Sequence, residues 1–272
     1  MIRARKRFGQ HFLEPVWVEK VIAAIAPQPH QDFIEIGPGP GALTRPLTGR
    51  ARSVTAYEID RDLAVALEVN APPNLTVVQG DFLNAKISDF RLQTSEFRVA
   101  GNLPYNVASP IMFKLVELHA AGVPLVDATL MLQREVADRL VAPPGSREYG
   151  VLSILIGHAA DVETVLKLPA GAFRPPPKVL SSLVRLRFRA PRPPVNDAAL
   201  FSRLVQAVFT RRRKTLANAL LALDGHAGPP LSRPAEVLEA SGLDGSRRPE
   251  TLSIAEFARL ADSYVPRRRA VL

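Results

Sequence analysis

Cysteine is absent from all 272 residues of the sequence. Disulfide bonds, zinc sites with cysteine ligands, cysteine-ligated iron–sulfur clusters and thiolate nucleophiles are therefore excluded. The five histidines are scattered along the chain, and no H-x-x-H or carboxylate–histidine spacing is present. We accordingly expect no metal site and a mechanism that needs no sulfur from the protein.

Long apolar runs are also missing, since none approaches the roughly 18 residues that a membrane-spanning helix needs. The first residues, MIRARKRFGQHFL, are basic but lack the apolar segment of a secretory signal. The same segment is short and lacks serine, which argues against a transit peptide. We therefore expect a cytoplasmic protein, with a length that suits one large α/β domain and a smaller one.

Positive charge is concentrated in three segments that flank the middle of the chain. Residues 1–10 carry four basic and no acidic side chains, residues 173–192 carry six and none, and residues 193–272 carry 12 basic and eight acidic ones. Residues 11–172 carry 18 acidic and 13 basic side chains. Basic flanks around an acidic centre are typical of a protein that holds a polyanion. A basic surface that only serves solubility is the alternative.

Four short apolar segments each end at a glycine or a polar residue. Residues 32–36 lead into Gly37-Pro-Gly39-Pro-Gly41, residues 54–57 end at Glu58, residues 75–79 precede Gly80-Asp81, and residues 99–101 precede Asn102. In an open α/β sheet, ligands bind at the carboxyl ends of the strands. We therefore expect Gly37, Glu58, Asp81 and Asn102 to converge on one edge of a sheet, although each of them alone also fits an ordinary turn.

The glycine-rich segment leaves two kinds of cofactor open. Gly37, Gly39 and Ala42 fit the dinucleotide pattern G-x-G-x-x-A, which favours an NAD-binding fold. Asp81, at the end of the third predicted strand, could instead accept a hydrogen bond from an adenine amino group, and Glu35 stands just before the first glycine. These two carboxylates favour S-adenosylmethionine over a dinucleotide.

The tetrapeptide Asn102-Leu103-Pro104-Tyr105 ends the fourth predicted strand. Pro104 has no NH to donate to a sheet, and it restricts the residue before it to extended geometry. The amide of Asn102 offers an acceptor beside a donor, and the ring of Tyr105 could stack on a flat ligand. This set suits a planar amine such as the amino group of adenine. The alternative is a polar strand-to-helix turn with a half-buried tyrosine.

The other segments predict alternating helices and strands, followed by a helical region. We expect helices over residues 15–26, 110–121, 134–141 and 151–160, and strands over 128–132, 162–168 and 182–188. The segment Ala190-Pro191-Arg192-Pro193-Pro194 predicts a linker, with helices over residues 197–223, 234–240 and 253–264 beyond it. The block Arg211-Arg212-Arg213-Lys214 interrupts the first of these helices and suits contacts to phosphates.

Seven motifs follow one another along nearly the whole chain. They are Gly9-Gln10-His11-Phe12-Leu13, Glu35-Ile36-Gly37-Pro38-Gly39, Glu58-Ile59-Asp60, Gly80-Asp81, Asn102-Leu103-Pro104-Tyr105, Phe173-Arg174-Pro175-Pro176-Pro177-Lys178-Val179 and Arg212-Arg213-Lys214-Thr215-Leu216. Together they closely resemble the bacterial small-subunit ribosomal RNA adenine dimethyltransferases. One position departs from the family's pattern: His11 stands where the family usually has asparagine, and both side chains can donate a hydrogen bond.

The resemblance implies an α/β fold, a Rossmann-like S-adenosylmethionine-dependent methyltransferase with a mostly parallel seven-stranded sheet in residues 1–190. Residues 191–272 are then a small all-helical domain that binds RNA. The implied reaction transfers two methyl groups from S-adenosylmethionine to N6 of each of two adjacent adenosines near the 3′ end of small-subunit ribosomal RNA. The implied partners are this RNA and the immature small ribosomal subunit, and nothing in the sequence requires a dimer.

The resemblance also assigns the site residues. The family's cofactor contacts fall on His11, Leu13, Gly37, Glu58, Asp81 and Asn102, to which we add Gly39. We expect Asn102 and Leu103 to accept hydrogen bonds from the target amine, Pro104 to fix the turn, Tyr105 to stack on the base and Phe173 to cover its other face. The expected RNA-binding residues are Arg5, Lys6, Arg7, Lys178, Arg211, Arg212, Arg213 and Lys214.

Three other functions compete with this interpretation. A large-subunit adenine methylase shares the cofactor motifs, but it is disfavoured by residues 173–179 and by the carboxyl-terminal helices. A non-catalytic RNA-binding assembly factor is disfavoured by the intact Asp81 and Asn102–Tyr105. An NAD oxidoreductase is disfavoured because no hydride-transfer site accompanies the glycine loop.

Overall fold

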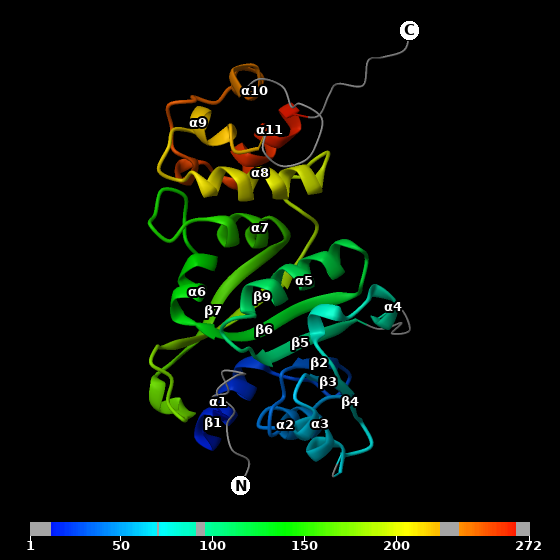
Figure 1. The fold of residues 1–272 in the computed structure, drawn as a ribbon. Coiled ribbons are helices and arrows are strands. Elements are labelled where there is room, and N and C mark those ends of the chain that lie inside the picture. Colours follow the sequence, from blue (N-terminus) through cyan, green and yellow to red (C-terminus); the bar gives the residue numbers. More distant parts are fainter. Residues whose placement is uncertain (1–11, 70, 91–95, 224–233, 265–272) are drawn as a thin grey trace. The chain divides into compact units, whose positions relative to one another are not determined.

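The structure is a computed structural model that describes residues 12–69, 71–90, 96–223 and 234–264. Its contacts divide the chain into two compact units (Figure 1). The first comprises residues 1–137 and 161–189, and the second comprises residues 138–160 and 190–272. The division after residue 189 lies next to the boundary expected at residue 190, whereas residues 138–160 belong to the second unit. The functions expected of the two domains stay predictions.

A seven-stranded sheet forms the centre of the first unit, in the order β4-β3-β2-β5-β6-β9-β7. Its strands are β2 (Asp32–Ile36), β3 (Ser53–Glu58), β4 (Leu75–Gln79), β5 (Phe97–Asn102), β6 (Leu125–Gln133), β7 (Ala160–Leu168) and β9 (Ser181–Phe188). The strands from β4 to β6 pair in parallel, and β9 pairs antiparallel to β6. Every residue of β2 is buried, as expected of a strand covered on both faces.

Helices cover both faces of this sheet in the first unit (Figure 1). The helices α1 (Pro15–Ile25), α2 (Thr44–Thr48) and α3 (Arg61–Glu68) lie on one side, and α5 (Ala108–Ala120) lies on the other. A short helix, α4 (Ile87–Phe90), and a single 3-10 turn, η2 (Phe82–Asn84), follow β4, and α6 (Arg134–Leu140) follows β6. Apolar residues of α1 pack with those of β2 in one buried cluster that includes Ile22, Ile25 and Phe33.

A separate two-stranded sheet, which the sequence did not predict, joins the amino terminus to the proline-rich segment. Strand β1 (Phe12–Leu13) pairs antiparallel with β8 (Phe173–Arg174), so that Leu13 lies opposite Phe173. The turn η3 (Ala170–Ala172) precedes β8, and the Glu14 amide donates to the Ala172 carbonyl at 2.9 Å. This pairing places the first described residues beside Phe173 and Arg174, although about 160 residues separate the two strands in the sequence.

The second unit is helical in its described parts. Its elements are α7 (Val151–Ala159), α8 (Ala198–Thr210), α9 (Leu216–Leu220), α10 (Pro234–Ser241), η4 (Pro249–Thr251) and α11 (Ile254–Tyr264). The Asp197 side chain caps α8 by accepting from the Leu200 amide at 2.8 Å. The helix expected over residues 197–223 is interrupted, since α8 ends at Thr210 and α9 begins at Leu216.

Most expected elements are present, and β2 and β4 have the bounds that were expected. The helix α3 was not expected, although Asp60 caps it by accepting from the Asp62 amide. Among the described residues, no helix combines the length and the apolar composition needed to cross a membrane.

Candidate active site

A cavity of about 210 Å³ lies at the carboxyl ends of β2, β3, β4 and β5. Its lining includes Leu13, Gly37, Gly39, Glu58, Asp81 and the four residues Asn102–Tyr105. The parallel topology thus brings together every cofactor-binding residue expected from the sequence that falls among the described residues. His11 lies outside them. Phe12, Tyr57, Ile59 and Phe82 also line the cavity and were not expected there.

The glycine loop after β2 requires left-handed backbone geometry. Gly37 has a φ of 68° and Gly39 a φ of 58°, a region that side chains with a Cβ rarely adopt. A Cβ on Gly39 would lie 3.6 Å from the ring of Phe12. The Gly39 amide donates to Glu58 Oε2 at 2.9 Å, so this geometry ties the loop to the end of β3.

Glu58 is a buried carboxyl that holds two backbone amides. Its Oε2 accepts from Gly39, and its Oε1 accepts from the Asp60 amide at 2.9 Å. Burial raises the pKa of Glu58, and these backbone hydrogen bonds lower it to a smaller extent. Each carboxylate oxygen can accept a second hydrogen bond, so Glu58 can organise the loop and still bind the hydroxyl groups of a ligand.

Asp81 follows β4 and begins the turn η2. Its Oδ1 accepts from the Leu83 amide at 3.0 Å, which fixes the direction of its carboxylate. The ring of Phe82 meets that of Tyr57 edge to face with centroids 5.3 Å apart. Both rings line the cavity beside Asp81, so the site combines a fixed acceptor with aromatic walls.

The turn after β5 is held at both ends. The Leu103 amide donates to the Met131 carbonyl on β6, and the Val107 amide donates to the Pro104 carbonyl at 3.1 Å. The Tyr105 hydroxyl lies 3.0 Å from Ser181 Oγ on β9, within hydrogen-bond distance. Burial raises the pKa of Tyr105, so its hydroxyl stays protonated at neutral pH. The tyrosine ring is therefore fixed by a strand on the far side of β6.

Phe173 packs in the core of the first unit. It is 2% exposed, belongs to the buried cluster that includes Leu13 and Leu183, and does not line the cavity. Strand β8 turns Phe173 toward the core and leaves Arg174 exposed. In this structure Phe173 pairs opposite Leu13 in the register of β1 and β8, and the expectation that it covers the target base stays a prediction.

Glu35, which the sequence offered as a sign of S-adenosylmethionine without a stated role, is a second buried carboxyl of the cavity. It is 1% exposed, and its Oε2 has no hydrogen-bond partner among the described residues. Burial, together with repulsion from Glu58, raises its pKa to about 7, against a smaller lowering by Thr44. The sequence signal for it is an acid between Ile34 and Ile36, two residues before the first glycine.

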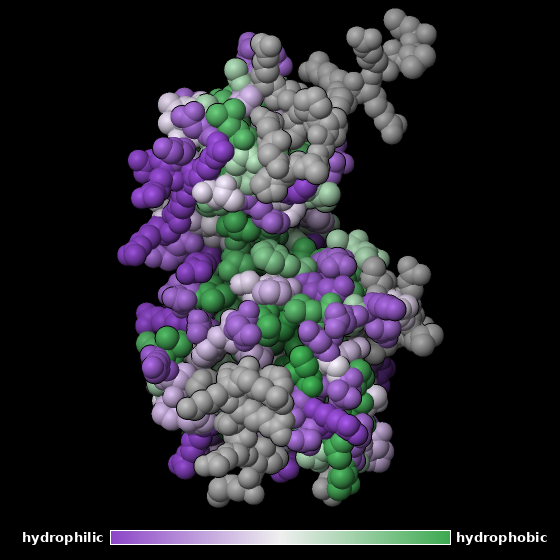
Figure 2. All heavy atoms as spheres, in the orientation of Figure 1, coloured by the Kyte–Doolittle hydropathy of each residue, from purple (hydrophilic) through white to green (hydrophobic). Residues whose placement is uncertain are grey.

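The expected RNA-binding residues differ in their surroundings. Arg212 donates to the Ser146 carbonyl at 3.1 Å and lies 3.9 Å from the Glu250 carboxylate, and Arg211 donates to the Asn218 carbonyl at 3.3 Å. Arg213, Lys214 and Lys178 are exposed, and the structure describes no ion pair for them. Figure 2 shows a strongly hydrophilic surface on the side of the second unit where α8 connects to α9. Arg5, Lys6 and Arg7 lie outside the described residues.

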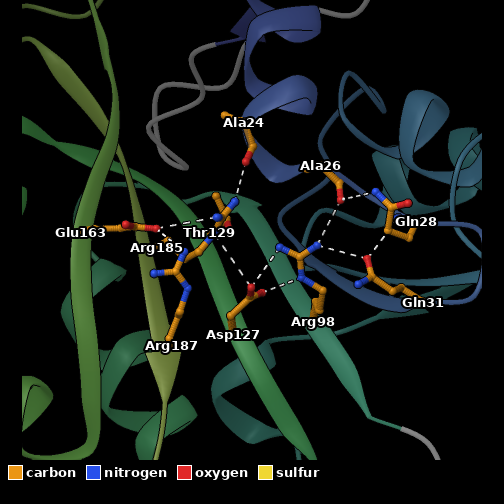
Figure 3. Close-up of polar contacts among 10 residues, drawn as sticks. All are labelled: Ala24, Ala26, Gln28, Gln31, Arg98, Asp127, Thr129, Glu163, Arg185 and Arg187. Atoms are coloured by element: carbon orange, nitrogen blue, oxygen red, sulfur yellow. Dashed lines mark hydrogen bonds and ion pairs between the residues drawn. The ribbon is translucent and has the colours of Figure 1, made fainter.

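The basic segment 173–192 is mostly neutralised by the fold. Arg185 lies 3.9 Å from Asp127 and 3.7 Å from Glu163, and Arg187 lies 2.7 Å from Glu163 (Figure 3). Arg189 pairs with Asp161 and Arg174 with Glu14. Carboxylates that are distant in the sequence thus pair with four of the six basic side chains of this segment, and the expectation that the segment holds a polyanion stays a prediction.

The described residues contain no cluster of three or more histidine and carboxylate side chains that could hold a metal ion. The polar groups of the cavity are instead carboxyl, amide and hydroxyl groups on strand ends.

Comparison with known proteins points to one family. The family model for ribosomal RNA adenine dimethylase matches residues 1–260. Ribosomal RNA small subunit methyltransferase A of Acinetobacter baylyi is 42% identical over 268 residues, which are 97% of this chain and 93% of that protein. Among solved structures, a dimethyladenosine transferase from Plasmodium falciparum has a TM-score of 0.72 and 26% identity, covering 92% of this chain and 96% of that one.

A large-subunit enzyme has a similar fold. The structure of the 23S rRNA methyltransferase ErmE has a TM-score of 0.63 and 28% identity, covering 93% of this chain and 99% of that one. That coverage includes most of the second unit, so the carboxyl-terminal helices do not separate small-subunit from large-subunit enzymes. Small-subunit and large-subunit enzymes are therefore distinguished by sequence. The relative that is 42% identical to this chain is a small-subunit enzyme.

Proposed function

The chain belongs to the ribosomal RNA adenine dimethylase family, and from that premise we propose that it dimethylates N6 of two adjacent adenosines near the 3′ end of small-subunit ribosomal RNA. It is an S-adenosylmethionine-dependent ribosomal RNA adenine dimethyltransferase, as its family is. The observation that carries the proposed substrate is the sequence identity of 42% to a small-subunit enzyme over 97% of the chain.

The cavity fits the cofactor. An unpartnered carboxylate oxygen of Glu35, two further carboxyls and left-handed glycines form a negatively charged cradle at a strand edge. S-adenosylmethionine supplies a methyl group on a sulfonium that leaves readily. The residues that we propose hold it are Leu13, Gly37, Gly39, Glu58, Asp81 and Asn102, together with His11, which lies outside the described residues.

The turn after β5 is proposed to bind and orient the adenine. Adenine N6 is a poor nucleophile because its lone pair is delocalised into the ring. We propose that the side-chain oxygen of Asn102 and the carbonyl of Leu103 accept hydrogen bonds from the N6 protons, which draws the nitrogen toward tetrahedral geometry. Tyr105, fixed by Ser181, provides a stacking surface for the extruded base. Phe173, which is 2% exposed and pairs opposite Leu13, is still proposed to cover the other face of the base, which requires its ring to move when RNA binds.

RNA binding is proposed for the basic residues that remain free of internal partners. Arg213, Lys214 and Lys178 are exposed, and Arg211 is exposed with one backbone contact. Arg5, Lys6 and Arg7 are added from the sequence. Arg212 is proposed to act in the second unit's own packing as well, since its guanidinium joins residues 146 and 250. We propose the immature small ribosomal subunit as partner and a monomeric enzyme.

The test is transfer of labelled methyl groups from S-adenosylmethionine to under-methylated small ribosomal subunits, followed by nucleoside analysis. We expect N6,N6-dimethyladenosine in the small-subunit RNA, and none when under-methylated large subunits are used instead. Transfer only to the large subunit would favour the ErmE-like alternative. Cofactor binding with no transfer to either subunit would favour the assembly-factor alternative.

A further inference from the structure

We propose that Glu35 binds the positively charged part of S-adenosylmethionine and that its carboxyl proton is released to solvent when the cofactor binds. This inference rests on the proposed function, because it takes S-adenosylmethionine as the ligand. It goes beyond that function in two ways: it gives the cavity a further binding residue, and it makes cofactor affinity depend on pH.

The position of Glu35 leaves its carboxyl without a partner from the neighbouring strands. It is the fourth residue of β2, and its register partners are Ala56 on β3 and Ala100 on β5, both fully buried. An alanine side chain offers no hydrogen bond. The carboxyl group lines the cavity, yet the residue is 1% exposed, so water competes little for it.

The polar neighbours of Glu35 do not neutralise it. Its Oε2 and the Oγ1 of Thr44 on α2 are both buried without a hydrogen bond of normal geometry to a described residue. A buried carboxylate oxygen without a donor is costly, and the cost falls when the group is protonated or when a cation approaches. Burial in the empty cavity therefore favours the neutral acid form of Glu35, and a neighbouring cation favours its carboxylate.

Every charged side chain that lines the cavity beside Glu35 is acidic among the described residues. Glu58 ends β3 and Asp81 follows β4, while β5 brings the neutral amide of Asn102 and α2 the hydroxyl of Thr44. Tyr57 on β3 stays neutral, since burial raises its pKa. No described residue that lines the cavity is an arginine, lysine or histidine. Burial and Glu58 raise the pKa of Glu35 to about 7, so about half of the molecules are protonated at pH 7.

The cofactor supplies the missing charge. S-adenosylmethionine carries an ammonium and a sulfonium group, S-adenosylhomocysteine carries the ammonium alone, and 5′-methylthioadenosine carries neither. A cation beside the carboxyl lowers its pKa, so the acid ionises and the proton passes to the buffer. Below pH 7 the affinity for S-adenosylmethionine then rises by up to about tenfold per pH unit, and above pH 7 it levels off.

Isothermal titration calorimetry tests this without any methyl transfer. The protein is titrated with each of the three ligands at pH 6, 7 and 8, in pairs of buffers that differ in ionisation enthalpy. For S-adenosylmethionine we expect release of about half a proton at pH 7, more at pH 6 and almost none at pH 8. For 5′-methylthioadenosine we expect no release. Release with S-adenosylhomocysteine equal to that with S-adenosylmethionine assigns the ammonium as partner, and its absence assigns the sulfonium.

Two variants separate Glu35 from other titrating groups. Glu35→Gln should bind S-adenosylmethionine without proton release and with an affinity that is flat between pH 6 and 8. Glu68→Gln, at an exposed position at the end of α3, should behave as the wild type. Unchanged proton release in Glu35→Gln, no release in the wild type, or equal release with 5′-methylthioadenosine would overturn the proposal. If Glu35→Gln does not fold, the comparison of ligands on the wild type still decides it.

The same titrations distinguish failure of this inference from failure of the proposed function. If S-adenosylmethionine binds but no proton release depends on Glu35, only this inference is contradicted. Failure of S-adenosylmethionine to bind in any buffer contradicts the function from which the inference proceeds.

Discussion

The two ends of the central sheet treat buried charge in opposite ways. At the amino ends of β5 and β6, Asp127 is 7% exposed, and Arg98 binds both of its oxygens, at 2.8 and 2.9 Å. Arg185 approaches the same carboxylate from β9 (Figure 3). At the carboxyl ends, Glu35 is 1% exposed and has an oxygen with no partner among the described residues.

The difference separates stability from function. The arginines around Asp127 also reach the carboxyl end of α1, where Arg98 lies 3.4 Å from the Ala26 carbonyl and Arg185 donates to the Ala24 carbonyl. This end of the sheet is therefore a closed network that holds α1 against three strands. The other end leaves hydrogen-bond acceptors without partners among the described residues, which costs stability. A bound ligand can supply the donors that these acceptors lack.

The largest effect is expected from breaking the closed network. Asp127→Ala leaves two arginines that are about 10% and 14% exposed without their shared carboxylate, and removal of one partner from a buried ion pair typically costs about 3–5 kcal/mol of stability. Asp161→Ala is the matched control, because Asp161 pairs with Arg189 at the surface and should cost less than about 1 kcal/mol. Urea denaturation measures both, and equal losses would show that burial does not distinguish them.

At the open end, loss of the Asn102 side chain should lower activity and leave stability nearly unchanged. Asn102→Ala removes a proposed acceptor for the target amine, and loss of one such group from an active site typically lowers kcat by about 100-fold or more. The free energy of unfolding should change by less than about 1 kcal/mol. Methyl transfer to under-methylated small subunits and urea denaturation measure the two effects, with the exposed Asn84→Ala as control. Near-normal turnover in Asn102→Ala would remove Asn102 from its proposed role.

The open end was easier to predict from the sequence than the closed one. Gly37, Glu58, Asp81 and Asn102 each follow an apolar run, so a parallel sheet is enough to bring them together. The partners of Asp127 are not local, since Arg98 is 29 residues away and Arg185 is 58 residues away. No periodicity encodes such a pairing, and for this reason the arginines of β9 were taken for part of a surface that holds a polyanion.

The orientation of Phe173 was hidden from the sequence for a related reason. Its orientation depends on the pairing of two strands of two residues each, Phe12–Leu13 and Phe173–Arg174, which are too short to give a pattern in the sequence. A one-residue shift of that register would exchange the buried and the exposed side chain. Sequence reasoning therefore found the motif that contains Phe173 but not the direction in which its ring points.

A third effect is expected from Glu35 itself, and it has the opposite sign to that of Asp127→Ala. The pKa of Glu35 is about 7 in the folded protein, against a reference value of 4.5, so the stability that its protonated form provides is lost as the pH rises from 4.5 to 7. A shift of this size corresponds to about 3 kcal/mol. Glu35→Gln should therefore be more stable than the wild type at pH 8, by up to that amount, and similar to it at pH 4.5.

Urea denaturation of both proteins at pH 4.5 and 8, without cofactor, measures this difference. Glu68→Gln, whose carboxyl is exposed, should show no comparable change with pH. A Glu35→Gln variant that is less stable than the wild type at pH 8 would show that the carboxylate has a donor in the folded protein, and the contrast with Asp127 would then disappear.

The smallest effects are expected in the second unit, where one run of four basic residues repeats the contrast between paired and unpaired charge. Arg212 contacts Ser146 and lies near Glu250, whereas Arg213 and Lys214 are exposed without a described ion pair. Loss of one phosphate contact lowers the slope of log affinity against log salt concentration by roughly 0.7–0.9. The double variant Arg213→Ala, Lys214→Ala should therefore flatten the salt dependence of RNA binding by about 1.5 and leave the unfolding free energy unchanged.

Arg212→Ala should instead cost about 1 kcal/mol of stability, because it removes the counter-ion of a largely buried carboxyl. Filter binding to small-subunit RNA at several salt concentrations measures the slope, and urea denaturation measures the stability. If Arg212→Ala flattened the slope and left the stability unchanged, Arg212 would contact RNA and its contacts with Ser146 and Glu250 would not stabilise the unit.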